Sequence, residues 1–321
     1  MVSSLAPQKA AGTQPSIRSK RRAIWGNIWK FKTLYLLSLP GILFFLVFKY
    51  VPLLGIVIAF KDYNLFKGVT DSPWAGLKHF QRMFEHYEFV DILTNTLLIA
   101  FYDMIFAFPA PIILALLLNE LRKVIFKRTL QTVIYMPHFL SWAVIAGIMI
   151  EILSPSGGLI NRIIEMLGFE SRYWLGEESY IRSILVGSGI WRDAGYGTII
   201  YLAALAGINP SLYEAAEMDG ANRWKQTLYI TLPALLPTIT ILFLLQIGNF
   251  LDFGFERVYV FLNPLNSANA DILDTYIYRV GLVEMQYSYT TAVGVFKSVV
   301  GLILIVVANQ LSKKATGNSL Y

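Results

Sequence analysis

The fourth apolar stretch of the chain carries side chains whose types suit the binding of a sugar. Within six residues it holds Trp191, Arg192, Asp193 and Tyr196. In a helix, Tyr196 lies one turn from Arg192 and Asp193, so these three share a face. Aromatic rings can stack on the C–H face of a sugar while charged groups bond its hydroxyls. A structural Arg–Asp pair between helices is the alternative, and it stays open.

A second polar group lies on the fifth apolar stretch. Gln246, Asn249 and Asp252 are spaced three apart and therefore form one polar stripe on a helix. Such a stripe can line a solute passage. It can equally be polar contact between helices in a membrane, and both interpretations remain.

Ionisable residues deep in a membrane are costly and point to function. Asp103 and Lys297 join Arg192 and Asp193 in this category. Arg192 and Lys297 would suit an acidic sugar, because a charge-assisted hydrogen bond to a carboxylate is about twice as strong as a neutral one. Asp193 argues against this, since it could neutralise Arg192 locally.

The elements that must position these groups are predicted to be membrane helices. The 321 residues are 55% hydrophobic and only 15% charged, which is typical of a polytopic membrane protein. A crossing needs about 20 mainly apolar residues. Six stretches qualify: 33–60, 92–119, 130–152, 182–206, 231–251 and 290–311. An all-α protein with six transmembrane helices is predicted, in which the first helix ends near Lys49.

The basic residues predict the orientation. Residues 1–34 contain seven Lys or Arg and no acid, and the short segment 120–129 is also basic. Because basic loops stay in the cytoplasm, both termini and residues 207–230 are predicted to be cytoplasmic. Residues 1–32 are then a retained cytoplasmic tail, disordered to about residue 20, and 313–321 a second tail. The net charge of +6 reflects this topology and does not indicate nucleic-acid binding.

The polar loop 207–233 connects the fourth and fifth predicted spans. It carries an EAA sequence, then three residues, a glycine and an Ile-x-Leu-Pro end. Ser211 and Glu214 have the spacing of a capping box, and Gly220 can adopt the positive φ that ends a helix. Ala215 and Ala216 leave a low surface that a partner can approach closely. An ordinary capped surface helix is the alternative.

Several classes of chemistry have no support in the sequence. Cysteine is absent and the three histidines, His79, His86 and His138, are scattered, so neither a metal site nor a cysteine nucleophile is visible. No phosphate-binding loop of the G-x-x-x-x-G-K-[ST] type occurs. The chain is therefore predicted to be no enzyme and to hold no cofactor. An intramembrane enzyme is the remote alternative, and it lacks a catalytic pair.

Taken together, these segments resemble the inner-membrane permeases of carbohydrate ABC importers. The loop residues Glu214, Ala215, Ala216, Asp219 and Gly220 match the cytoplasmic coupling loop of binding-protein-dependent importers. Residues 48–55, 135–142 and 274–279 are similar to permeases for complex oligosaccharides. The resemblance covers about residues 33–312 and implies the type I importer permease fold.

The resemblance also implies partners. They are a second homologous permease, two ATPase subunits that hold ATP and Mg, an extracellular sugar-binding lipoprotein, membrane lipid and an oligosaccharide. No nucleic acid is among them. The implied location is the bacterial plasma membrane, with several crossings and both termini cytoplasmic. The substrate is expected to be an oligosaccharide, including acidic pectin-type fragments. A neutral sugar, an amino acid or a peptide is the alternative solute.

Finally, the resemblance assigns a substrate pathway. By their distance from the coupling loop, the sugar-contacting stretches of the maltose permease correspond to two groups here. The first group is Arg192, Asp193 and Tyr196, and the second is Gln246, Phe250 and Phe253. Trp191 and Asn249, which belong to the residue patterns described above, complete the predicted pathway. Phe250 and Phe253 replace amides of that permease and Arg192 introduces a charge, so maltose is not the expected substrate.

Overall fold

The computed structural model describes residues 30–252 and 254–316. The predicted disorder near the N-terminus lies outside these residues. The chain divides into two compact units, one ending at Val57 and the other beginning at Ile58.

The described part of the first unit is a membrane-type helix. It consists of α2 (Lys32–Phe45), a π-helical turn η1 (Leu46–Tyr50), α3 (Val51–Leu53) and the start of a 3-10 segment η2 (Leu54–Phe60). These segments join into one helix, Lys32–Phe60. The prediction that it ends near Lys49 is wrong: the backbone stays helical through the π turn, where the Lys49 side chain is exposed.

The second unit is all-helical over its described residues, which confirms the predicted fold class. Its earlier helices are α4 (Gly68–Asp71), α5 (Lys78–Glu85), α6 (Tyr87–Tyr102), η3 (Asp103–Ala107), α7 (Pro109–Asn119), α8 (Val124–Tyr135), η4 (Met136–Phe139), α9 (Trp142–Ile152), α10 (Leu159–Met166) and α11 (Glu178–Ala206). The later ones are α12 (Pro210–Met218), α13 (Arg223–Gln226), η5 (Thr227–Thr231), α14 (Leu232–Gly248), α15 (Phe255–Tyr259), α16 (Ser267–Ala270), α17 (Leu273–Tyr276), η6 (Ile277–Val283) and α18 (Tyr287–Thr316).

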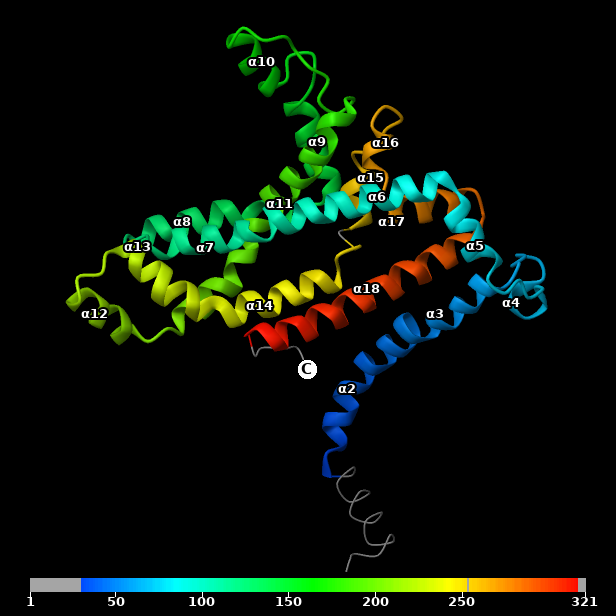
Figure 1. The fold of residues 1–321 in the computed structure, drawn as a ribbon, viewed down its shortest axis with the longest axis horizontal. Helices are drawn as coiled ribbons and strands as arrows, with labels where there is room; N and C mark the ends of the chain where they lie inside the picture. Colours follow the sequence, from blue (N-terminus) through cyan, green and yellow to red (C-terminus); the bar gives the residue numbers. More distant parts are fainter. Residues whose placement is uncertain (1–29, 253, 317–321) are drawn as a thin grey trace, which may run out of the picture. The chain divides into compact units, whose positions relative to one another are not determined.

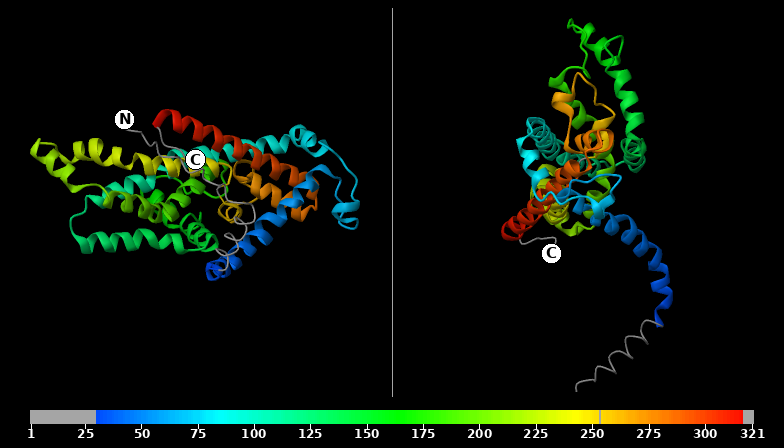
Figure 2. Two further views of the ribbon diagram at one scale, coloured as in Figure 1. Left: turned by 90° about the horizontal axis from the view of Figure 1, so that it is seen from below. Right: turned by 90° about the vertical axis from the view of Figure 1, so that its right-hand side faces the viewer.

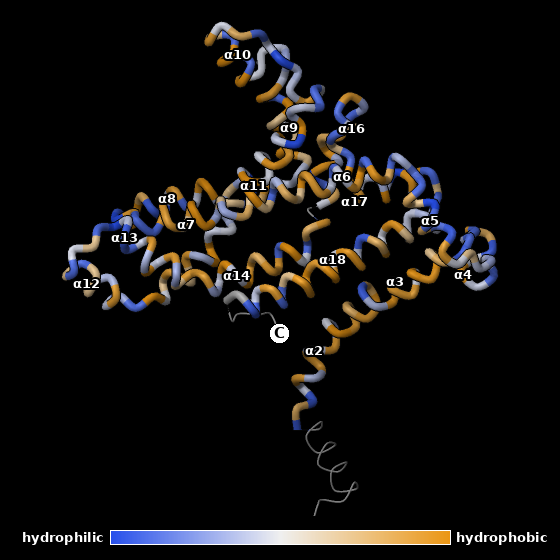
Figure 3. The backbone as a smooth tube through the Cα atoms, in the orientation of Figure 1, coloured by the Kyte–Doolittle hydropathy of each residue, from blue (hydrophilic) through white to orange (hydrophobic). Residues whose placement is uncertain are grey.

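Membrane-spanning length and composition are found in four helices of the described chain. They are Lys32–Phe60, Tyr87–Asn119, Arg223–Gly248 and Tyr287–Lys314, and a bent pair of helices can count as a fifth. Helix α11 is long enough at 29 residues, but its charged and polar residues keep it out of this group. In Figure 3 the hydrophobic colouring follows α7, α14 and α18, whereas the region of α13 is hydrophilic.

The bent pair corrects the predicted continuous span 130–152. Helices α8 with η4 (Val124–Phe139) and α9 meet at an angle of 104°. Pro137 lies in the 3-10 turn that ends the first part, and Leu140 is extended with ψ 140°. The Ser141 side chain then caps α9 by accepting from the Val144 amide. The apolar composition is continuous here, but the helix is not.

The core of this unit forms around α11. It packs most extensively on α7, while α14 lies beside α18 (Figures 1 and 2). Ile145, Leu185 and Val258 are fully buried in the largest core cluster. Gly195 allows the closest approach, since a Cβ there would lie 2.0 Å from the Ile134 carbonyl oxygen on α8. A small residue at this position lets the two helices touch through their backbones.

Candidate functional site

The predicted coupling loop forms a short, exposed helix. Helix α12 is capped by Asn209, whose Oδ1 accepts from the Ser211 amide at 3.1 Å. The predicted capping box of Ser211 and Glu214 is therefore wrong: Pro210 starts the helix, so Ser211 lies inside it and Asn209 takes the cap.

The end of α12 follows the sequence prediction. Gly220 has a φ of +75°. Its amide donates to the Glu217 carbonyl at 3.0 Å, and the Ala221 amide donates to the Ala216 carbonyl at 2.9 Å. This pair of bonds is a Schellman motif. Met218 and Leu212 are exposed apolar side chains on the same short helix.

One link between α12 and the fifth span was not predicted. The Tyr213 hydroxyl lies 2.9 Å from Thr231 Oγ1, and Thr231 is buried in the π turn η5 at the start of α14. This contact joins α12 to the π turn from which α14 continues. Tyr213 directly precedes the EAA sequence, but its spacing to Thr231 carries no signal of contact.

A cavity of about 530 Å³ lies between η3, α7, α11, α14 and α15. We call it the central cavity. Three of the predicted pathway residues line it: Asp193, Gln246 and Asn249. Asp252 also lines it, so the polar stripe of the fifth stretch meets the fourth span, although α14 ends at Gly248 and the stripe continues into the following loop.

The remaining predicted pathway residues lie elsewhere. Trp191, Arg192, Tyr196 and Phe250 are not part of the described cavity lining, and Trp191 is 43% exposed. On a helix, Arg192 and Trp191, one and two positions from Asp193, point in other directions. Phe253 lies outside the described residues.

Arg192 and Asp193 form a local pair. Arg192 Nη1 is 3.2 Å from Asp193 Oδ1, and the guanidinium lies 4.8 Å from the centre of the Trp142 ring. Asp193 Oδ1 is also 2.8 Å from His138 Nδ1. The His138 ring stacks on Tyr196 with 3.9 Å between ring centres. His138 thus contacts both Asp193 and Tyr196 on this face of α11, although its position in the sequence gives no sign of these contacts.

Asp103 has a partner that sequence reasoning missed. Arg257 Nη1 and Nη2 donate to its two carboxylate oxygens at 2.7 and 2.9 Å. Both side chains are buried, and Arg257 also donates to the Leu185 carbonyl at 2.7 and 3.1 Å. Gly189 makes room, since a Cβ there would lie 2.8 Å from the guanidinium carbon. The pair forms one wall of the central cavity.

Lys297 is paired as well. It forms a short ion pair with Asp274, and its Nζ is 3.9 Å from Asp252 Oδ1. These groups line a neighbouring cavity of about 570 Å³ between α14 and α18. Asn249 and Asp252 line both cavities. The two cations expected to receive a substrate carboxylate, Arg192 and Lys297, therefore each already contact an aspartate.

Comparison with known proteins identifies the class to which this bundle and loop belong. Residues 107–317, which contain α12 and every described lining residue of the central cavity except Asp103, match the family of binding-protein-dependent transport system inner membrane components. The chain belongs to this family. It is a multi-pass membrane subunit of an ABC importer that works with a solute-binding protein, and it is not itself catalytic.

Individual relatives make the comparison more specific. The chain is 48% identical to the polygalacturonan/rhamnogalacturonan transport system permease protein YteP of Bacillus subtilis (strain 168), over 95% of both chains. It is 49% identical to Protein LplB of the same organism, over 90% of this chain and 91% of that one. A solved bacterial ABC transporter that imports the acidic polysaccharide alginate has a chain with 38% identity and a TM-score of 0.85, covering 92% of this chain and 99% of that chain. The resemblance to carbohydrate importer permeases is confirmed.

Proposed function

We propose that this permease carries uronate-containing oligosaccharides, such as pectin fragments, across the bacterial plasma membrane. The supporting observation is the end-to-end similarity to a permease named for polygalacturonan and rhamnogalacturonan. The alginate importer adds a second relative whose substrate is acidic. Their polymers share the uronic acid carboxylate, although their sugars differ.

The assembly that we propose has four membrane-associated subunits. A second, similar permease would complete the passage. One of two ATPases would dock on α12 and the other on the corresponding helix of the second permease. An extracellular sugar-binding lipoprotein would deliver the substrate, in line with the alginate transporter solved with a pentasaccharide-bound periplasmic protein. Glu214, Ala215, Ala216, Asp219 and Gly220 would pass ATPase closure to the bundle, and Tyr213 would relay it to α14.

The central cavity is the proposed passage for the sugar. Its lining offers the carboxylate of Asp193 and the amides of Gln246 and Asn249 beside aromatic and apolar groups. This mixture suits sugar hydroxyls, because a few placed polar groups in an apolar pocket fix a ligand's orientation. Arg192 is assigned a structural role, since Asp193 neutralises it.

Transport by the reconstituted importer, supplied with its solute-binding protein, tests the proposal. We expect ATP-dependent uptake of labelled galacturonate oligomers. The matched control is the same oligomer after its carboxylates have been reduced to primary alcohols. Faster uptake of the acidic oligomer is expected. Efficient uptake of the reduced oligomer alone would assign the permease to neutral sugars.

A further inference from the structure

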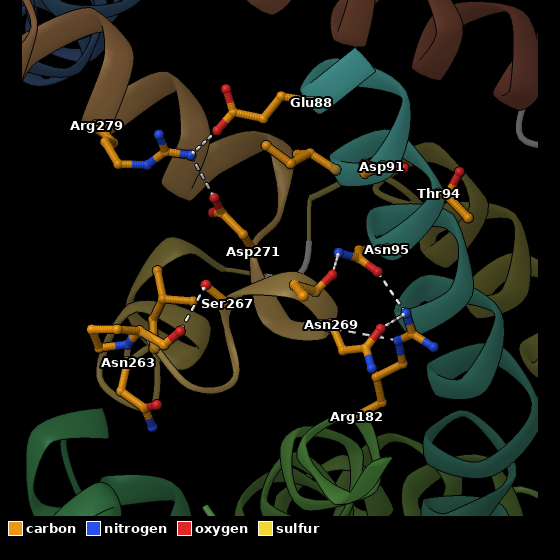
Figure 4. A pocket seen from close by; sticks show the side chains of 14 residues that line it. Glu88, Asp91, Thr94, Asn95, Arg182, Asn263, Ser267, Asn269, Asp271 and Arg279 are labelled. Carbon is orange, nitrogen blue, oxygen red and sulfur yellow. Dashed lines mark hydrogen bonds and ion pairs between the residues drawn. The ribbon is translucent and has the colours of Figure 1, made fainter. Parts of the chain in front are cut away.

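A larger cavity lies away from the proposed passage. It encloses about 720 Å³ between the start of α6, the start of α11 and the loop around α16 and α17 (Figure 4). We call it the outer cavity. Its volume is within the range of about 300–1,000 Å³ of small-molecule sites. The amides of Asn95, Asn263 and Asn269 line it together with the guanidinium of Arg182.

Arg182 is held in this cavity by neutral groups. Its Nη2 donates to Asn95 Oδ1 and to Asn269 Oδ1, both at 2.6 Å, and its Nε donates to the Asn269 carbonyl at 3.3 Å. Figure 4 shows the guanidinium clamped between these two asparagines. The charge is therefore oriented by hydrogen bonds without being neutralised by an acid.

This arrangement distinguishes Arg182 from the other cations of the cavities. Arg279 also lines the outer cavity, Arg257 lines the central cavity and Lys297 lines the neighbouring cavity. Each of them contacts at least one carboxylate: Arg257 contacts Asp103, Arg279 contacts Glu88 and Asp271, and Lys297 contacts Asp274. Among the described residues that line these three cavities, Arg182 is the only Lys or Arg whose hydrogen-bond partners are all amide oxygens.

The remaining donors of the cluster are suited to a sugar acid. No described residue accepts from Arg182 Nη1, so two N–H groups are left for a ligand carboxylate. Asn263 and Asn269 each use one amide hydrogen, on the carbonyls of Leu175 and Glu178. Each therefore has a second N–H for a hydroxyl.

The position of Arg182 along α11 fits the arrival of substrate. Helix α11 leads directly into the coupling helix α12 at its other end. With a rise of 1.5 Å per residue, Arg182 lies about 36 Å along the axis from Ala206. In the proposed orientation the outer cavity is therefore on the side away from the ATPases, where the binding protein releases the sugar.

We propose that the outer cavity is a subsite that holds one uronate residue of the oligosaccharide on its way to the central cavity. Arg182 Nη1 donates to the uronate carboxylate, and Asn263 and Asn269 donate to ring hydroxyls. The inference rests on the proposed function, because it names a site for the same substrate class.

Asp91 would repel the uronate carboxylate bound at Arg182, so replacing it tests the proposed subsite independently of Arg182. It is exposed on the lining, one helical turn before Asn95 on α6. The described residues include no ion-pair partner for it, whereas Glu88 and Asp271 share Arg279. A carboxylate held at Arg182 should therefore be repelled by Asp91, most strongly at low ionic strength.

The experiment measures the KM for uptake by the reconstituted importer at low salt. The two substrates are a galacturonate oligomer and its carboxyl-reduced counterpart. For Arg182→Gln we expect about a tenfold increase in KM for the acidic oligomer, as for one lost charge-assisted bond, and a change below about twofold for the reduced one. Arg182→Lys should retain part of the preference. Asp91→Asn should lower the KM for the acidic oligomer only.

The possible failures are distinguishable. If the wild-type importer takes up only the reduced oligomer, the proposed function itself is wrong. If it takes up the acidic oligomer but Arg182→Gln raises both KM values equally, Arg182 is a structural clamp and the subsite is refuted. Should Arg182→Gln fail to fold, Asp91→Asn decides, because this residue is exposed and has no ion pair or side-chain hydrogen bond to the described residues. An unchanged KM for the acidic oligomer would then refute the subsite.

Discussion

At the scale of single residues, the buried Arg257–Asp103 pair determines how α15 is held against the bundle. Two charges taken out of water are tolerated only with good geometry and satisfied hydrogen bonds. Both conditions are met by the two-pronged carboxylate contact and the Leu185 carbonyl. Because the pair also lines the central cavity, it fixes one wall of the proposed passage.

Breaking this pair should be costly. Removing one member of a buried ion pair leaves an unpaired buried charge and costs about 3–5 kcal/mol. Arg257→Met is therefore expected to lower the melting temperature of the detergent-solubilised protein strongly. Asp103→Asn in the same chain should recover part of the loss. If the double variant is no more stable than Arg257→Met, the charge on Asp103 is not what the arginine balances.

The long-range contacts of buried charged residues could not be predicted from the sequence. Asp103 stands out there as a charge in an apolar stretch, but its partner lies 154 positions away in a segment that reads as an outer loop. His138 lies in residues 135–142, which resemble oligosaccharide permeases, but its contact with Asp193 spans 55 positions and could not be predicted. Local spacing could show that Asp193 and Tyr196 share a face. It could not show which third residue joins them.

At the scale of elements, helices were predictable where apolar composition and local chemistry agreed. The turn after α12 followed from a glycine at the right distance from the EAA sequence, because only local backbone preferences act there. The bend between α8 and α9 was missed for the opposite reason. Residues 130–152 remain mainly apolar through the break. Hydropathy depends on composition alone and therefore cannot show that the helix axis changes direction.

The turn after α12 can be tested without steric complications. A Cβ at Gly220 would meet nothing within 4 Å, so a substitution acts only through the positive φ. Gly220→Val should cost about 1–2 kcal/mol in the turn and reduce transport, while binding of sugar to the solute-binding protein stays normal. Gly220→Asn is the matched control, since asparagine tolerates this conformation. Normal transport by the valine variant at normal abundance would exclude a coupling role for the turn.

The contact of α11 with α8 offers a second test at this scale. A methyl group at Gly195 would lie 2.0 Å from the Ile134 carbonyl oxygen, so Gly195→Ala must push the helices apart. We expect a loss of about 1–3 kcal/mol, as for other overpacked sites, seen as a lower melting temperature. Gly187→Ala on the same helix is the control, because nothing lies within 4 Å there. Equal stability of both variants would contradict the close packing.

At the scale of the whole molecule, the orientation in the membrane decides which cavity meets the substrate first. The basic residues predict, by the positive-inside rule, that α12 is cytoplasmic. The family assignment gives α12 the same side independently, because the ATPases of an importer are cytoplasmic. The outer cavity and the loop after Phe60 then lie outside. The proposed role of the outer cavity depends on this orientation.

Single cysteines can test the orientation cleanly, because the chain contains none. Met218 on α12 is 88% exposed and Phe66, in the loop before α4, is 96% exposed. A membrane-impermeant maleimide added to right-side-out vesicles should label Phe66→Cys rapidly. Met218→Cys should be labelled only after the vesicles are opened. Labelling of Met218→Cys in sealed vesicles would reverse the topology, put the outer cavity on the ATPase side and remove the argument that Arg182 meets the arriving sugar.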